Sequence, residues 1–392
     1  MVDRLATRTQ SISPFYVMEL LHRARQLEAQ GRDVIHMEIG EPDFPTPATI
    51  VETGIQYLQT GEVKYTPAAG LAELREKIAN YYRQHYGVSV AKERIFVTPG
   101  ASGAFLLALG VSLNPGEEIL MADPCYPCNR NFVALFDGDT LTIPVDASTH
   151  YHLTEDLIRQ HWTAKTKGVL IASPSNPTGT LIDPIRLKQA IEMVNSSGGC
   201  FYSDEIYHGL VYSTKATTAL QFSDDVFVIN SFSKYFGMTG WRIGWLIVPD
   251  AFIEATEKLA QNIFIATSSL SQYAALSAFD QHTLRDLERR RTEFAQRRDF
   301  LYENLLRIGF DVPIKPQGAF YIYADCSRFT DDSFQFAQEF LEAEAVAVTP
   351  GKDFGMHHSE RYIRFAYTTS MDRMTSAMQR LEKFLNQRSL CR

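Results

Sequence analysis

Short apolar runs and helical patterns alternate along the middle of the chain, from residue 94 to residue 248. The runs are rich in β-branched and aromatic residues, which is typical of buried strands. They occupy residues 95–98, 118–122, 141–145, 169–172, 200–203, 226–230 and 243–248. Helical periodicity at residues 104–113 and 185–195 separates some of these runs. The alternation predicts an α/β fold, with a mostly parallel sheet of about seven strands between helices.

Both ends of the chain follow a different pattern. Before the sheet, a short strand is expected at residues 33–39, and helical spacing marks residues 15–29, 48–59 and 71–86. After it, a long charged amphipathic helix is expected at residues 284–308. Short strands and one more helix follow, at residues 318–323, 333–343, 346–349 and 362–366. This last part is typical of a smaller α+β unit.

Length, composition and charge exclude several classes of protein. A chain of 392 residues can form more than one structural unit, and 45% hydrophobic and 21% charged residues are ordinary for a globular protein. A net charge of -8 without long runs of one sign argues against a nucleic-acid partner. No apolar stretch has the length of a membrane span or the form of a signal peptide. We therefore expect a cytoplasmic protein with no membrane partner.

The five cysteines do not form a disulfide framework in a chain of this length. Cys125 and Cys128 have the C-x-x-C spacing that zinc sites and redox sites use. No second pair of this kind exists, and Pro127 lies directly before Cys128. We interpret both cysteines as reduced thiols near a pocket, and we expect no metal site.

The segment between the last two predicted strands concentrates reactive groups. A lysine at the end of a strand, such as Lys234, can lose its proton and become the nucleophile for a Schiff base. The hydroxyls of Ser231 and Ser233 and the guanidinium of Arg242 are suited to hold a phosphate. A phosphate beside such a lysine suggests pyridoxal phosphate. The alternative is a surface loop with a solvated lysine.

Two further segments supply the remaining parts of such a site. Asp204 directly follows the strand at residues 200–203, and a pyridoxal ring needs an acid at its pyridine nitrogen. Asn176 lies in the proline-rich turn at residues 172–179. With these three segments together, the sequence resembles the class I/II pyridoxal-phosphate aminotransferases, whose fold is that of aspartate aminotransferase (fold type I). The resemblance covers nearly the whole chain, from about residue 11.

The resemblance implies a division into two domains and a shared site. A large cofactor-binding domain would span residues 46–282, and a small discontinuous domain would combine residues 1–45 with residues 283–392. Tyr65 matches a tyrosine that reaches the cofactor phosphate of the neighbouring subunit. The family therefore implies a homodimer with its sites at the subunit interface.

The resemblance also assigns roles around the cofactor ring. Lys234 matches the lysine that forms the internal aldimine and then moves the proton as general base and acid. Asp204 would keep the pyridine nitrogen protonated, so that the ring accepts electrons. Tyr126 matches a stacking aromatic, although a core aromatic is the alternative. Asn176 and Tyr207 match donors to the phenolic oxygen of the ring, and Asn176 could also cap its own turn.

Anion-binding groups are expected at both ends of the bound molecules. The backbone of Gly100, Ala101 and Ser102, after a strand and before a helix, is a ready phosphate site. Dinucleotide binding is an alternative, but the full G-x-G-x-x-G spacing is absent. At the other end, Arg364 matches the arginine that clamps the substrate α-carboxylate by a bidentate pair, assisted by the backbone N–H of Gly40.

The choice of substrate is where the resemblance says least. Relatives that prefer acidic substrates place a cation near the position of Ser102, where this chain has none. Asn176 and Tyr16 are expected to contact the substrate. Phe15, Tyr16 and Phe264 suggest an apolar or aromatic side-chain pocket, although all three could be core residues.

The function that these features predict is amino transfer. The enzyme would move an amino group between an L-amino acid and a 2-oxo acid in two half-reactions, a ping-pong mechanism. A β-eliminating lyase of the same fold is an alternative, because the same lysine, aspartate and arginine serve both reactions. A non-catalytic regulator that binds the cofactor is a second alternative.

Overall fold

The computed structural model describes residues 4–10, 12 and 15–390. Its central feature is a seven-stranded sheet with the strand order β2-β8-β7-β6-β5-β3-β4. β8 runs antiparallel to both of its neighbours, and the other paired strands are parallel. The strands are β2 (Ile95–Thr98), β3 (Glu118–Asp123), β4 (Asp139–Pro144), β5 (Thr166–Ala172), β6 (Cys200–Asp204), β7 (Phe227–Ser231) and β8 (Gly244–Ile247). The predicted α/β fold with a mostly parallel seven-stranded sheet is confirmed.

Apolar side chains cover both faces of this sheet. Successive residues of a strand point to opposite faces, so Leu120 of β3 joins one core cluster while its neighbours Ile119 and Met121 join the other. In β7, Val228 and Phe227 are divided in the same way. A sheet that is buried on both faces needs a layer of helices on each side, which explains the nearly continuous apolar runs in the sequence.

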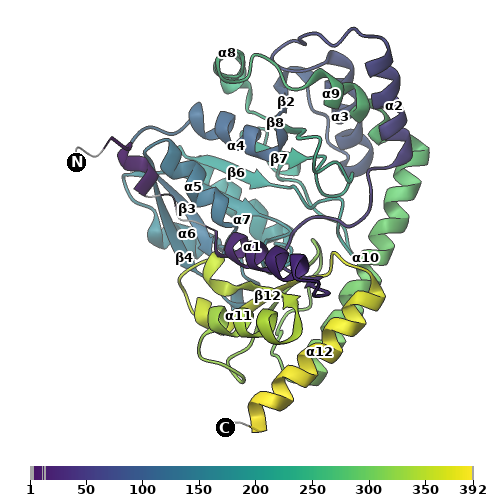
Figure 1. Cartoon of the computed structure of the whole chain (residues 1–392). Coiled ribbons are helices and arrows are strands. Elements are labelled where there is room, and N and C mark those ends of the chain that lie inside the picture. Colours follow the sequence, from purple (N-terminus) through teal and green to yellow (C-terminus); the bar gives the residue numbers. More distant parts are fainter. Residues whose placement is uncertain (1–3, 11, 13–14, 391–392) are drawn as a thin grey trace.

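Helices between residues 48 and 275 pack around the sheet (Figure 1). They are α2 (Ala48–Gln59), α3 (Ala72–Tyr86), α4 (Gly100–Gly110), α5 (Pro127–Leu135), α6 (Glu155–His161), α7 (Pro184–Ser196), α8 (Ile253–Ile263) and α9 (Ser269–Ala275). α4 is apolar on nearly every side, and most of its residues are buried. A helix of this kind is stable only inside a core, so it packs directly against β7 and β8.

A second, smaller assembly of strands and helices lies beside the large sheet. A three-stranded antiparallel sheet has the order β11-β12-β9, and β1 pairs with β10 in parallel. Figure 1 shows α10 running along one side of both assemblies and α1 lying between them. These elements are α1 (Tyr16–Ala29), β1 (Ile35–His36), α10 (Gln281–Ile308), β9 (Tyr321–Asp325), α11 (Ser333–Glu344), β10 (Val346–Ala347), β11 (Thr349–Pro350), β12 (Tyr362–Ala366) and α12 (Met371–Leu390).

The domain boundaries at residues 45/46 and 282/283 stay a prediction. All seven strands of the large sheet lie within residues 46–282, and the strands of both smaller sheets lie outside that range. The predicted small domain also includes residues 1–3, 11, 13–14 and 391–392, which lie outside the described residues.

Some predicted element boundaries are wrong. The helix expected at residues 104–113 is α4, which already begins at Gly100, so the glycine-rich motif forms its first turn. The strand expected at residues 346–349 is two strands, because the chain changes its pairing partner from β1 to β12 at Val348. The strand expected at residues 318–323 begins only at Tyr321, since Ala319 has a positive φ. The first strand is limited to Ile35–His36, because its partner β10 is equally short.

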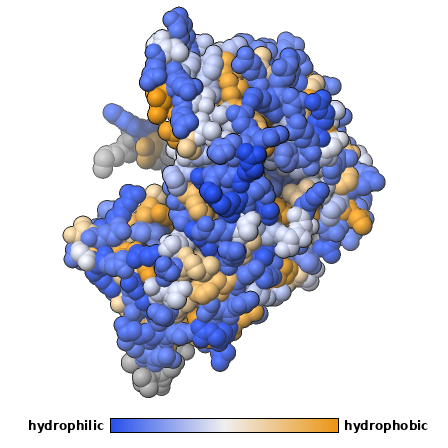
Figure 2. All heavy atoms as spheres, turned by 90° about the vertical axis from the view of Figure 1, so that its right-hand side faces the viewer, coloured by the Kyte–Doolittle hydropathy of each residue, from blue (hydrophilic) through white to orange (hydrophobic). Residues whose placement is uncertain are grey.

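The surface is mostly polar, with some exposed apolar side chains. Figure 2 shows the face on the right-hand side of Figure 1, where hydrophobic patches are scattered among hydrophilic residues. On α2 and the loop after it, Ile55, Leu58 and Val63 are about half exposed, and Tyr65 is 83% exposed. Within the part of the chain that the structure describes, no helix has the length and hydrophobicity of a membrane span.

The N-terminus of α11 provides a test of the fold. The carboxylate of Asp332 accepts hydrogen bonds from the backbone N–H groups of Phe334 (2.9 Å) and Gln335 (3.1 Å). Because an N-cap carboxylate satisfies otherwise free N–H groups, Asp332→Ala should lower the free energy of unfolding by about 1 kcal/mol. Asp331→Ala is the matched control, since it removes the same charge from the neighbouring exposed position. Equal midpoints of urea unfolding for the two variants would contradict this capping role.

Candidate active site

A cavity of about 410 Å³ lies where the carboxyl ends of the parallel strands meet the smaller assembly. This volume is in the range of small-molecule sites. Ala172 at the end of β5 and Asp204 at the end of β6 line it, together with residues that follow β2, β3 and β7. Thr349 and Arg364 line it from β11 and β12. Parallel strands end at one edge of a sheet, so functional groups from distant segments converge there.

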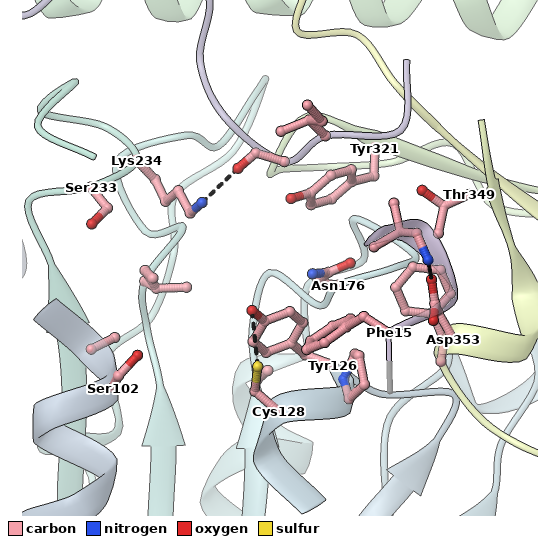
Figure 3. Close-up of a pocket in the computed structure, with 18 of the residues that line it drawn as sticks. Phe15, Ser102, Tyr126, Cys128, Asn176, Ser233, Lys234, Tyr321, Thr349 and Asp353 are labelled. Carbon is pink, nitrogen blue, oxygen red and sulfur yellow. Dashed lines mark hydrogen bonds between the residues drawn. The ribbon is translucent and has the colours of Figure 1, made fainter. Parts of the chain in front are cut away.

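Most of the predicted site residues come together in this cavity. Eleven of them line it: Gly40, Ala101, Ser102, Tyr126, Asn176, Asp204, Tyr207, Ser233, Lys234, Arg242 and Arg364. Figure 3 shows Lys234, Ser233 and Ser102 on one side of the cavity, and Tyr126, Phe15 and Asp353 on the other.

Four predicted residues do not line the cavity. Ser231 is buried, and its hydroxyl contacts Ser233 Oγ at 2.9 Å and the carbonyl oxygen of Ile243 at 3.1 Å, so it supports Ser233 from behind. Gly100 lies behind Arg242. The ring of Tyr16 packs against Phe334. Tyr65 is on the surface. The predicted roles of these residues stay predictions, and the position of Tyr16 does not favour a contact with the substrate.

The pocket that was predicted from three aromatic residues is only partly correct. Phe15 lines the cavity, but Phe264 packs with the core cluster around α4. Phe264 lies near Gly103, where the lack of a side chain leaves room for the ring. Phe264 therefore packs among the side chains around α4 and is not one of the described residues that line the cavity.

Buried aromatic residues and a backbone hydrogen bond stabilise the turn that carries Lys234. Phe232 and Phe236 are buried and lie 5.0 Å apart between ring centroids, and the N–H of Met238 donates to the carbonyl of Phe232 at 3.0 Å. The Lys234 amine points the other way, where Nζ donates to the carbonyl oxygen of Gly40 at 2.6 Å. This turn therefore fixes the amine at the edge of the large sheet, against a loop of the smaller assembly.

The amine of Lys234 is easier to deprotonate than that of an ordinary lysine. Burial lowers its pKa to about 8, and the positive charges of Arg364 and Arg242 act in the same direction. Glu41 and Asp204 oppose this shift. Near neutral pH, a larger share of such an amine is neutral than of an ordinary lysine. A neutral amine is both a nucleophile and a base.

Asp204 is a buried carboxylate with room for a cationic partner. It is paired in register with Ala172 of β5, and Oδ1 accepts a hydrogen bond from the N–H of Ile206 at 3.2 Å. Burial raises its pKa to about 7. No ion pair joins it to another described residue. A protonated ring nitrogen in the cavity would supply the missing positive charge and lower this pKa again.

The opposite end of the cavity is suited to an anion. Gly100 begins α4 with a φ of 71°, and a Cβ at this position would lie 2.6 Å from Nη2 of Arg242. The guanidinium of Arg242 therefore lies against the N-terminus of α4, where free N–H groups point out of the helix. Ala101, Ser102 and Ser233 line the cavity beside it. Helix N–H groups, hydroxyls and a guanidinium are the groups that proteins use to bind phosphate.

Arg364 provides a second, separate cation. It is only 5% exposed, and its guanidinium carbon lies 4.2 Å from the ring centroid of Tyr321 and 4.8 Å from that of Phe354. Nη1 donates to Oδ1 of Asn176 at 2.9 Å, and Nη2 donates to the carbonyl oxygen of Glu38 at 2.5 Å. Nε has no hydrogen-bond partner among the described residues. A fork held in this way can bind a carboxylate.

Comparison with known protein families identifies the family of this chain. Residues 32–381 match the model of the family described as "Aminotransferase class I and II". The chain belongs to this family.

Several aminotransferases resemble the chain over nearly its whole length. The (5-formylfuran-3-yl)methyl phosphate transaminase of Methanocaldococcus jannaschii is 38% identical, over 97% of this chain and 100% of the relative. The valine–pyruvate aminotransferase of Mycobacterium tuberculosis is 35% identical, over 98% and 99%. The aspartate aminotransferase of Thermotoga maritima is 34% identical, over 95% and 96%. The protein is thus an aminotransferase, but its relatives act on different substrates.

Solved structures agree with this assignment. An aminotransferase from Mycobacterium tuberculosis superposes with a TM-score of 0.95 at 35% identity, over 98% of this chain and 100% of the other. A protein from Methanococcus jannaschii, described as similar in its active site to kynurenine aminotransferases, has a TM-score of 0.91 at 38% identity, over 97% and 100%. The chemistry of the family is pyridoxal-phosphate-dependent transamination, as the resemblance implied.

Sequence reasoning missed several residues of this aminotransferase site. The hydroxyl of Tyr321 lies 2.9 Å from that of Tyr207, and a Cβ at Gly40 would lie 1.9 Å from it, so Gly40 cannot be replaced without moving Tyr321. Glu38 and Asp353 also line the cavity. The signal for Tyr321 was its place in a short aromatic strand, but the sequence does not show which face of that strand is functional.

Arg364 provides a test of the site. Arg364→Ala removes a charge-assisted, two-pronged contact, so we expect kcat/KM for amino-acid substrates to fall about 30- to 1000-fold, or about 2–4 kcal/mol. Arg364→Lys should recover little, because an ammonium cannot form the fork. Arg361→Ala is the control, since that arginine is partly exposed and pairs with Asp325 outside the cavity. Steady-state kinetics with full recovery in the lysine variant would exclude a bidentate clamp.

Proposed function

We propose that the cavity binds pyridoxal phosphate and that the enzyme passes an amino group from an L-amino acid to a 2-oxo acid by a ping-pong mechanism. The amino acid leaves as its 2-oxo acid, and the second 2-oxo acid leaves as an amino acid. The observation that carries this proposal is one cavity with three parts. It is lined by a lysine of lowered pKa, by a buried carboxylate that has no ion pair among the described residues, and by an anion site at a helix N-terminus.

The residues of the cavity fit the parts of this cofactor. Arg242, Ser233 and the first N–H groups of α4 would hold its phosphate. Asp204 would accept the hydrogen bond of the protonated ring nitrogen, and Tyr126 would face the ring. Asn176 and Tyr207, which line the same cavity, would donate to the oxygen of the ring. Pyridoxal phosphate would pair the carboxylate of Asp204 with its ring nitrogen and fill the anion site with its phosphate.

Once bound, pyridoxal phosphate supplies an electron sink for the carbon that loses its amino group. The other requirements fall on the protein. Lys234 holds and moves the proton, because its pKa of about 8 makes it a base and an acid near neutral pH. Asp204 supplies negative charge at the far end of the cavity. Arg364 fixes the α-carboxylate of the substrate, and thereby places the α-carbon within reach of the lysine.

We also propose that the enzyme acts as a homodimer in which Tyr65 serves the partner's site. Tyr65 is 83% exposed and does not line the cavity of its own chain. Three apolar side chains that are near it in the sequence, Ile55, Leu58 and Val63, are about half exposed, and water solvates them poorly. A second copy that covers this surface would bury these side chains.

The assignment of Lys234 is tested by trapping. After reduction of the cofactor-loaded enzyme with borohydride, peptide mapping should find the modified lysine at position 234. Lys234→Ala should lose amino transfer while its circular-dichroism spectrum stays that of the wild type. Lys215→Ala, at an exposed position, should retain full activity. The assay follows both amino transfer and free ammonia, and release of ammonia without a 2-oxo acid acceptor would indicate a lyase instead.

The shared site is tested with hybrid dimers assembled from two inactive or weakened chains. A Lys234→Ala chain and a Tyr65→Phe chain, carrying different tags, should form a hybrid in which one site has both lesions and the other has none. At limiting cofactor, activity per intact lysine should then exceed that of the Tyr65→Phe homodimer. The control is a hybrid of Lys234→Ala with Arg364→Ala, which should show no recovery. If the Tyr65 hybrid behaves like this control, Tyr65 does not serve the partner's site.

A further inference from the structure

The charges around the cavity leave no cation for a substrate side chain. Among the described residues that line it, the cationic side chains are those of Lys234, Arg242 and Arg364, and each has a place in the proposed site. The carboxylates among the lining residues are those of Glu38, Asp204 and Asp353. The described lining residues of this chain therefore offer no further cation to a second carboxylate of the substrate. Desolvation of an unpaired carboxylate is costly.

Apolar side chains form the rest of the lining. One group comes from the start of α1, and the other apolar residues come from α4, α5 and the loop after β11. Phe105 and Phe132 are stacked, with ring centroids 5.3 Å apart. The residues concerned are Phe15, Val17, Met18 and Leu21, which form the α1 wall, and Phe105, Phe132 and Phe354.

A contact over a long sequence separation holds the α1 wall in place. The carboxylate of Asp353 accepts hydrogen bonds from the backbone N–H groups of Tyr16 (2.7 Å) and Val17 (2.8 Å). Phe15 precedes the helix and makes no side-chain cap, so Asp353 does what an N-cap residue would do. The helix dipole favours an anion at this end. Asp353 is only 4% exposed and is labelled beside the wall in Figure 3.

We propose that the enzyme selects amino acids with a bulky hydrophobic side chain, of the size of leucine, methionine or phenylalanine, and discriminates against aspartate and glutamate. This inference rests on the proposed function. The side chain packs on the α1 wall (Phe15, Val17, Met18 and Leu21), while Arg364 holds the α-carboxylate. Asp353 is a positioning residue, because it acts through α1.

The first experiment compares amino donors on the wild-type enzyme loaded with pyridoxal phosphate. The absorbance change of the cofactor in the donor half-reaction gives a rate and an apparent Kd for each amino acid. We expect the ratio of rate to Kd for leucine, methionine and phenylalanine to exceed that for aspartate and glutamate at least about 30-fold. Alanine is the reference, since its methyl group is too short to need the wall.

Variants of the wall locate the selectivity. Val17→Lys adds a cation to the α1 wall. We expect it to lower the preference for leucine over aspartate, measured as the ratio of their values of rate over Kd, at least about tenfold. Ile185→Lys is the control, because it adds the same charge at an exposed position on α7, outside the cavity. Asp353→Ala should raise the apparent Kd for leucine more than the apparent Kd for alanine. Asp353→Asn keeps an acceptor oxygen, so its apparent Kd for leucine should lie close to that of the wild type.

The possible outcomes distinguish a failure of this inference from a failure of the proposed aminotransferase function. Transfer from aspartate or glutamate at a rate equal to that from leucine would overturn the inference and leave the aminotransferase intact. The inference would also be overturned if the wall variants slowed amino transfer from leucine, alanine and aspartate by the same factor. If no amino donor changes the cofactor spectrum, the proposed function fails together with the inference. The donor comparison uses the native chain, so it does not depend on how any variant folds.

Discussion

Everything in the site depends on how little water reaches the amine of Lys234. The large sheet alone would leave this amine at an open edge, and an exposed lysine is protonated at neutral pH. The loop that contains Gly40 and the strand that contains Tyr321 close the edge from the other side. Burial then lowers the pKa of the lysine, which suits the amine to proton transfer near neutral pH, and it raises the pKa of Asp204, which favours a cationic partner for this carboxylate. Catalytic function therefore needs both assemblies, and Gly40 is small because the hydroxyl of Tyr321 occupies the place of a side chain.

Two kinds of residues share the cavity and come from different parts of the structure. The groups that favour the reaction, such as Asp204 and Lys234, lie at the ends of strands β6 and β7, where the sheet fixes them. The residues that face a substrate side chain come mainly from α1 and the loop that holds it. A helix laid over the edge can vary without disturbing the sheet. This separation is consistent with relatives that share one fold and one type of reaction but are named for valine, aspartate or a furan phosphate.

Local signals in the sequence predicted the sheet and much of the site. Buried strands are short continuous apolar runs, so β2 and β12 were predicted with their observed bounds. Asp204 could be recognised because it directly follows such a run, and Lys234 because Ser231, Ser233 and Arg242 surround it between two runs. The errors occur where tertiary pairing determines the bounds of a strand. Val348 lies in a single apolar run, yet the chain changes its partner strand there. Contacts over long separations, such as that of Asp353 with α1, leave no local pattern, and neither does the direction in which Tyr321 points.

The capping of α1 has a consequence for the order in which the protein matures. A helix of 14 residues without its own N-cap is marginally stable in isolation. On the ribosome α1 emerges among the first elements, but the carboxylate that caps it belongs to Asp353 and emerges more than three hundred residues later. The large sheet can therefore assemble before α1 receives its cap, and the α1 wall of the cavity is completed only after residue 353 has been synthesised. A nascent chain that stalls before this point would have Lys234 in place but no fixed surface for the side chain of a substrate.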